Sequence, residues 1–152
     1  MKLAEALIER AELKKENAQL LSRIKSNTLV QEGDSPAEDP EALIAQYEHN
    51  MEHLLWLVQK INETNSKTSF DDNMSISDAI ALRDFYGAKH KAYQTMYEST
   101  TISVNRYSQN EIKFVRSLQP SVIQKKIDEV AKKYRKLDTK LQGLNWTVDL
   151  IE

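Results

Sequence analysis

The sequence predicts an all-α fold: an antiparallel four-helix, coiled-coil-like bundle with a β-hairpin inserted between the third and fourth helices. Gly and Pro occur only three times each, and 29% charged with 40% apolar residues is typical of amphipathic helices. Helical apolar spacing recurs over residues 2–27, 40–65, 75–100 and 120–145. We expect residues 1–152 to form a single domain, because this length can bury a sizeable core.

The strongest helical pattern lies in residues 40–65. Asp39 and Pro40 supply an N-cap and a first-turn proline. Residues 55–57 add apolar side chains between the seam positions, so one partner helix could not cover the whole apolar surface. Steps of three and four residues join the predicted seam positions Ile44, Tyr47, Met51, Leu54, Val58 and Ile61.

The first predicted helix, residues 2–27, has polar residues on its apolar seam at Arg10, Asn17 and Asn27. A buried Asn commonly fixes helix register or oligomeric state, which is the role we expect for Asn17. Arg10 must reach water or pair with a carboxylate, since an unpaired buried charge is costly. The segment that follows contains Gly33 and two prolines and is expected to be a loop.

The remaining elements follow from local signals. Ser75 and Asp78 form a capping box that begins the third helix, and Gly87 within that helix predicts a close helix approach. Apolar residues alternate with polar ones over residues 101–116, which predicts the β-hairpin. Pro120 begins the fourth helix, whose apolar seam is uninterrupted.

An up-and-down order of helices would gather polar residues at one end and along the seams of the bundle. Arg10 would then lie level with Arg83, Asp84 and Asp138 in a buried Arg/Asp network, which is more often structural than catalytic. Asn62 and Asn65 also fit a simple capping role. The candidate binding residues are Arg10, Asn62, Asn65, Arg83, Asp84, Asn145 and Trp146.

Little in the sequence indicates catalysis or a cofactor. His49 and His53 lie four residues apart, but they fall off the seam and lack the further ligands of a helical di-iron site, so we expect solvent-facing histidines and no bound metal. The chain has no cysteine, which excludes thiol chemistry. No nucleophile or acid/base pair has catalytic spacing, so an enzyme is the less favoured hypothesis and no cofactor is expected.

Charge is divided unevenly along the chain. Residues 1–76 carry 8 basic and 14 acidic side chains, whereas residues 77–152 carry 13 and 9. The basic fourth helix could bind phosphates, but an outer face paired with an acidic helix or subunit explains the same pattern, so nucleic acid is an unlikely partner. The first 15 residues mix charged and apolar residues, and we expect no signal peptide and a cytoplasmic protein.

Several motifs together resemble the septicolysin-like family of small bacterial proteins. They are MKLAEALIERAEL, NTLVQEG, INETN, SISDAIALRD, RYSQNEIK and LDTKLQGLNWTVDL, in that order and across essentially the whole chain. The resemblance implies a coiled-coil-rich, self-assembling helical protein of uncharacterised activity, and the family name implies a pore-forming cytolysin. It also points to the loop residues Asn27, Gln31 and Glu32.

The function that we expect is assembly or binding without catalysis, with the chain itself as the partner. The apolar surface of residues 54–58, the seam of the fourth helix and the hairpin together exceed what one four-helix core must bury. A homo-oligomer of closed symmetry would cover the remainder. The alternatives are a cytolysin, which alone would make a membrane a partner, and binding of a ligand or nucleic acid through the polar cluster or the basic helix.

Overall fold

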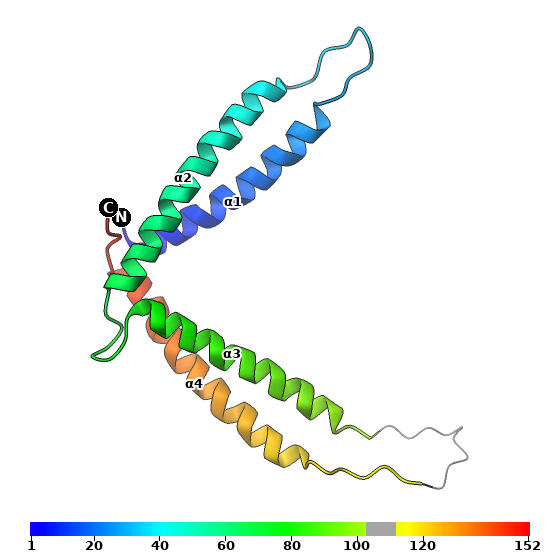
Figure 1. Cartoon of the computed structure of the whole chain (residues 1–152), viewed down its shortest axis with the longest axis vertical. Coiled ribbons are helices and arrows are strands. Elements are labelled where there is room, and N and C mark those ends of the chain that lie inside the picture. Colours follow the sequence, from blue (N-terminus) through cyan, green and yellow to red (C-terminus); the bar gives the residue numbers. More distant parts are fainter. Residues whose placement is uncertain (103–111) are drawn as a thin grey trace. The chain divides into compact units, whose positions relative to one another are not determined.

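The computed structural model describes residues 1–102 and 112–152, and these residues form four α-helices (Figure 1). The helix boundaries expected from the sequence lie within two residues of the observed ones. The protein is all-α, as predicted. In chain order the helices are α1 (Leu3–Ser26), α2 (Pro40–Lys67), α3 (Ile76–Ser99) and α4 (Pro120–Thr147).

The predicted β-hairpin between α3 and α4 is wrong. Among its described residues, Thr101, Ile102 and residues 112–116 form no strand, while residues 103–111 lie outside the described part of the chain. Ile112, Phe114 and Val115 are 84%, 86% and 84% exposed. A two-stranded hairpin is marginal in water without a surface to pack on, and these side chains pack on none within the described residues, so alternating sequence alone did not produce strands.

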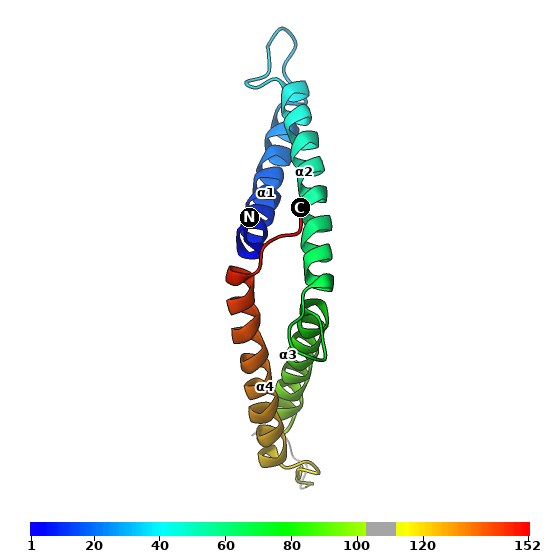
Figure 2. The same cartoon turned by 90° about the vertical axis from the view of Figure 1, so that its left-hand side faces the viewer.

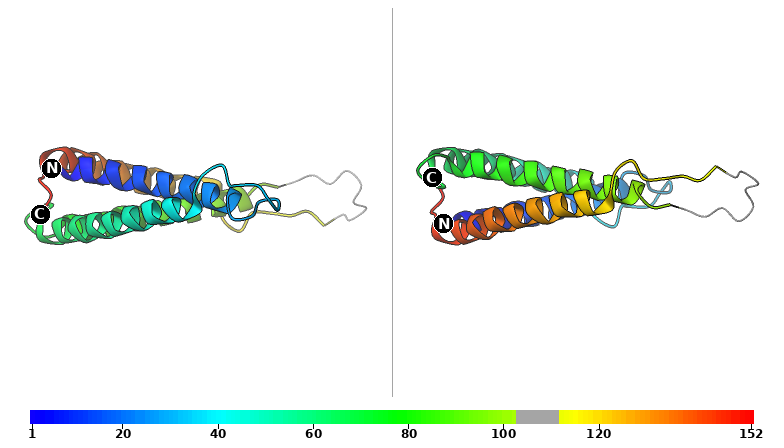
Figure 3. Two further views of the ribbon diagram at one scale, coloured as in Figure 1. Left: turned by 90° about the horizontal axis from the view of Figure 1, so that it is seen from above. Right: turned by 90° about the horizontal axis from the view of Figure 1, so that it is seen from below.

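The chain divides into two compact units, residues 1–76 with 143–152 and residues 77–142, and each is described by itself. Unit 1 contains the antiparallel hairpin of α1 and α2, which lie side by side (Figure 2). Unit 2 contains the antiparallel hairpin of α3 and most of α4 (Figure 3). That residues 1–152 act as one domain stays a prediction.

Unit 1 buries a core where the open ends of α1 and α2 meet the C-terminal residues. Leu3, Ala6, Leu57, Ile61 and Leu150 form this core, and Trp56 packs against it half-buried. Burying a Leu or Ile side chain contributes about 1.5–3 kcal/mol. The hydrophobic contact of α1 with α2 is therefore strongest at the end where the C-terminal residues also pack.

Backbone hydrogen bonds hold the two ends of the chain together within unit 1. The Leu3 amide donates to the Val148 carbonyl at 2.9 Å, and the Leu150 amide donates to the Met1 carbonyl at 2.9 Å. Ile151 donates its amide to the buried Thr64 hydroxyl at 3.0 Å, and that hydroxyl donates to the Lys60 carbonyl. These bonds place Leu150 over the core.

The predicted seam residue Ile61 is buried in the core, but nearer the start of α2 the buried stripe differs by one residue from the seam that the sequence predicted. Leu43, Asn50, Leu57 and Thr64, spaced seven residues apart, are buried, whereas the predicted seam residues Ile44 and Met51 are each 41% exposed. Neighbouring residues on a helix point about 100° apart. The prediction therefore took a row at the edge of the helix interface for its centre.

The two sides of the α1–α2 hairpin differ in chemistry. On one side, polar side chains spaced seven or eight residues apart join α1 to α2 or to the loop before α2, and they close that edge of the interface. The pairs are Glu9 with His53 at 2.8 Å, Gln46 with Glu16 at 3.0 Å, and Arg23 with Glu38. Ile44 and Met51 each lie two residues from a bridging residue, which turns them about 200° away from the bridged side.

Unit 2 packs around a seam of aliphatic residues on α4. Ile123, Ile127, Val130 and Leu141 are buried, as the uninterrupted seam of the sequence predicts. At Gly87 the Tyr134 ring of α4 lies against α3, since an added Cβ there would lie 3.3 Å from Cε2 of Tyr134. A larger residue at this position would push the Tyr134 ring aside, and the close approach of the two helices expected at Gly87 stays a prediction.

Candidate functional site

An ion-pair network of three residues joins α3 to α4. Nη1 of Arg83 donates to Oδ1 of Asp138 at 3.1 Å, and its Nε and Nη2 both donate to Oδ1 of Asp84 at 3.1 Å. Burial lowers the pKa of Arg83, but the hydrogen bonds and charges of Asp84 and Asp138 outweigh it and hold the pKa above its usual value. The guanidinium is thus a permanent charge satisfied by two carboxylates, which suits a clamp between helices better than proton transfer.

The candidate residues expected near one end of the bundle divide between the two units. Arg83 and Asp84 belong to unit 2, together with Asp138. Arg10 makes no hydrogen bond or ion pair within the described part of unit 1. The remaining candidates, all in unit 1, are Asn62, Asn65, Asn145 and Trp146. A binding role for the whole set stays a prediction.

The unit 1 candidates show different environments. Asn62 is exposed, and its carbonyl accepts a hydrogen bond from Ser66 at 2.8 Å, as expected near a helix end. Oδ1 of Asn65 is buried without a partner among the described residues. Asn145 is half-buried, and Trp146 is largely exposed. No hydrogen bond within the described part of unit 1 joins two of these side chains, so they do not form a network.

The loop candidate Asn27 has a structural role. Its Oδ1 accepts from the Glu38 amide at 3.0 Å, and its Nδ2 donates to the Arg23 carbonyl at 2.8 Å, so the buried side chain joins the end of α1 to the end of the loop. Gln31 contributes its carbonyl to a turn that ends at Asp34, and Glu32 is exposed. Gly33, which lies between Glu32 and Asp34 in this turn, has φ +87°, a conformation that favours glycine.

Two buried asparagines face the interior of the α1–α2 hairpin. Asn17, expected from the sequence to be buried, donates from Nδ2 to the sulfur of Met51 at 3.4 Å. Asn50 is also buried, and the sequence reasoning missed it because the seam was assigned one residue away. Its signal was the seven-residue spacing from Leu43 and Leu57. Buried amides inside an apolar helix pair favour one register over others.

The histidines show no metal site. His53 bonds to Glu9 and stacks on Trp56 with ring centroids 5.7 Å apart, while His49 is exposed. Within residues 1–102 and 112–152, no group of three or more His, Asp or Glu side chains could hold a metal ion. Over the same residues, no helix is both long and apolar enough to span a membrane.

Exposed apolar side chains form a stripe on α2, which we call the α2 outer stripe. It consists of Ile44, Met51 and Leu55, of which Leu55 is 58% exposed. The spacing of seven and four residues places them on one face. Exposed acids without ion pairs in the described part of the chain run alongside at Glu41, Glu48 and Glu52.

A second exposed row, the α3 outer stripe, lies on unit 2. It consists of Phe85, Ala88, Ala92 and Met96, spaced three and four residues apart on one helix face. Phe85 is 52% exposed, and Nζ of Lys89 lies 5.2 Å from the centre of its ring. A basic side chain therefore lies directly on this apolar row, in contrast to the acids beside the α2 outer stripe.

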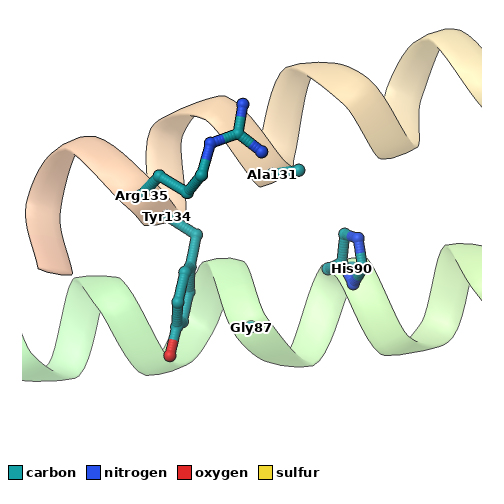
Figure 4. A pocket seen from close by; sticks show the side chains of 5 residues that line it. All are labelled: Gly87, His90, Ala131, Tyr134 and Arg135. Atoms are coloured by element: carbon teal, nitrogen blue, oxygen red, sulfur yellow. The ribbon is translucent and has the colours of Figure 1, made fainter.

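A half-open pocket of about 280 Å³ lies between α3 and α4. It is lined by Gly87, His90, Ala131, Tyr134 and Arg135. Figure 4 shows the His90 ring between the helices, the Tyr134 ring reaching α3 beside Gly87, and the Arg135 side chain extending along α4 toward Ala131. The pocket thus combines small apolar walls with an imidazole, a phenol and a guanidinium.

These features define an all-α protein built from two helical hairpins, with apolar outer stripes and a small polar pocket. Residues 10–150 match a family described as a family of unknown function (DUF6847), and the chain belongs to this family. It is also similar to a solved structure, the crystal structure of a functionally unknown conserved protein from Corynebacterium diphtheriae. The two chains are 38% identical, the match covers 99% of each, and the TM-score is 0.93. No curated protein matches the chain.

The resemblance to the septicolysin-like family is wrong. The match over residues 10–150 is to a family of unknown function, and neither it nor the similar crystal structure names a septicolysin. Some of the short motifs that carried the resemblance are local signals, such as SISDAIALRD at the start of α3 and NTLVQEG in the loop after α1. Such motifs record local backbone requirements and identify a family poorly. Family and structure agree in leaving the activity unassigned.

Proposed function

We propose that the protein acts by self-association, in a structural or binding role without catalysis, and that a second copy covers the α2 outer stripe. The observation that carries this proposal is the row of exposed Ile44, Met51 and Leu55, which lies along the edge of the α1–α2 interface opposite the bridged side. Apolar patches of this kind on a folded chain mark interaction surfaces. If the α2 outer stripe packs on the α3 outer stripe of the second copy, the exposed apolar residues of α3 are covered as well.

Charge supports a second copy as the occupant. Unit 1 carries 16 acidic and 8 basic side chains, net −8, and unit 2 carries 13 basic and 7 acidic, net +6. Unit 1 of one copy and unit 2 of another therefore attract each other, and such complementarity favours correct encounter and register.

The same charges decide which helix of the partner lies on α2. Two α2 helices packed together would oppose the acidic edges formed by Glu41, Glu48 and Glu52, and opposed like charges are destabilising. The α3 outer stripe instead offers Phe85 and Met96 with Lys89 beside them. We therefore propose that the α3 outer stripe of the second copy packs on the α2 outer stripe. In a two-fold pair this contact forms twice, because each copy offers both stripes.

Cross-linking of single-cysteine chains tests this assignment, and the natural chain has no cysteine to interfere. A Leu55→Cys chain mixed with a Phe85→Cys chain should give a covalent pair with a flexible bis-maleimide. An Ile8→Cys chain is the matched control, because Ile8 is similarly exposed but lies on α1, away from the stripe. Cross-linking of Leu55→Cys chains mainly to each other would contradict the α2–α3 pairing. If Ile8→Cys chains cross-link to Phe85→Cys chains with the same yield as Leu55→Cys chains do, the interface is not specific.

A further inference from the structure

We propose that the pocket between α3 and α4 binds a small organic carboxylate with a flat apolar body. This inference is independent of self-association, because all five lining residues belong to unit 2 of one chain. Three observations carry it: the space left by small residues, the absence of a carboxylate from the lining, and the polar groups that remain without partners.

Small residues line the pocket on both helices, Gly87 on α3 and Ala131 on α4. The glycine lets the Tyr134 ring lie against α3 as one wall of the pocket, since an added Cβ there would come 3.3 Å from Cε2 of that ring. A volume of about 280 Å³ lies just below the usual range for ligand pockets, so only a small molecule fits. The backbone at Gly87, the Ala131 methyl group and the tyrosine ring favour a flat apolar body.

The pocket carries positive charge and open hydrogen-bonding capacity. Arg135 makes no ion pair, and His90 makes no hydrogen bond, within the described part of the chain. No Asp or Glu lines the pocket, and the nearby Asp138 is already bonded to Arg83. A guanidinium is always ionised and binds a carboxylate through two parallel hydrogen bonds. The group best matched to these donors is therefore an anion with two oxygen acceptors.

Benzoate is a suitable probe, because it joins a flat ring to a carboxylate. Titration of the full chain, followed by amide resonances of Gly87 and Ala131 in two-dimensional NMR, should show saturable shifts. Benzyl alcohol, which has the ring without the charge, and inorganic phosphate, which has charge without the ring, should each bind more weakly. Phosphate binding as tight as that of benzoate would overturn the apolar part of the proposal.

Two variants separate the pocket from general positive charge. Arg135→Gln should weaken benzoate binding about tenfold, the loss expected for a charge-assisted hydrogen-bonded pair. Lys136→Gln removes the same charge at the next position of α4, outside the pocket lining, and should leave the affinity unchanged. The spectra show directly whether each variant is folded. Absence of saturable shifts in the natural chain, or equal weakening by both variants, would overturn the proposal.

Discussion

Replacing Leu55 by glutamate is expected to dissociate the assembly that we propose. Leu55 is the most exposed member of the α2 outer stripe, so the substitution costs the isolated chain little. Covered by a second copy, the new carboxylate would lose its hydration in an apolar contact, which costs several kcal/mol, and an ion pair with Lys89 of the partner subunit would offset only part of that cost. Self-association should weaken by roughly a hundredfold or more, measured by sedimentation equilibrium.

Ile8→Glu is the matched control for this experiment. Ile8 is an exposed aliphatic residue of the same unit, but it lies on α1, outside the stripe. The control should associate like the natural chain and show the same helical circular dichroism. If Leu55→Glu associates as tightly as Ile8→Glu, the α2 outer stripe is not the contact surface.

Replacing Leu57 by alanine should lower the free energy of unfolding by about 2–5 kcal/mol, because it leaves a cavity in the core of unit 1. Leu57 is fully buried and packs in one cluster with Leu3, Ile61 and Leu150. Urea unfolding followed by circular dichroism measures the loss, and the slope of the transition should stay unchanged. Leu55→Ala, two residues away, removes the same atoms from an exposed position. In the dissociated chain it should change stability by at most about 0.5 kcal/mol.

The comparison of Leu55 with Leu57 also shows what the sequence could predict. Helix positions followed from capping residues and from apolar spacing, and α2 begins at Pro40 as Asp39 and Pro40 indicate. The sequence did not show which face of α2 is turned toward α1, because the apolar residues of α2 extend around more than one face. Ile44, Met51 and Leu55 are as hydrophobic as Leu43 and Leu57, and only the position of α1 decides which row is buried.

The hairpin and the candidate site illustrate two other limits. Alternation around Ile112 and Phe114 favours a strand locally, but a strand also needs a partner and a surface, which a local pattern does not record. The pairing of Arg83 with Asp138 joins residues 55 positions apart, and it could be anticipated only by aligning helices along a bundle. The pocket was missed because Gly87 indicated only a close approach of helices and Ala131 carries no chemical signal of its own.

The mass of the purified natural chain in solution tests the central claim most directly. Light scattering at micromolar concentration and low salt should give twice the chain mass of 17.5 kDa, or a higher multiple of it. Raising the salt should reduce the associated fraction, because attraction between the acidic unit 1 and the basic unit 2 of different copies is screened. A mass of 17.5 kDa under all these conditions would contradict self-association and leave the two outer stripes without the occupant assigned to them.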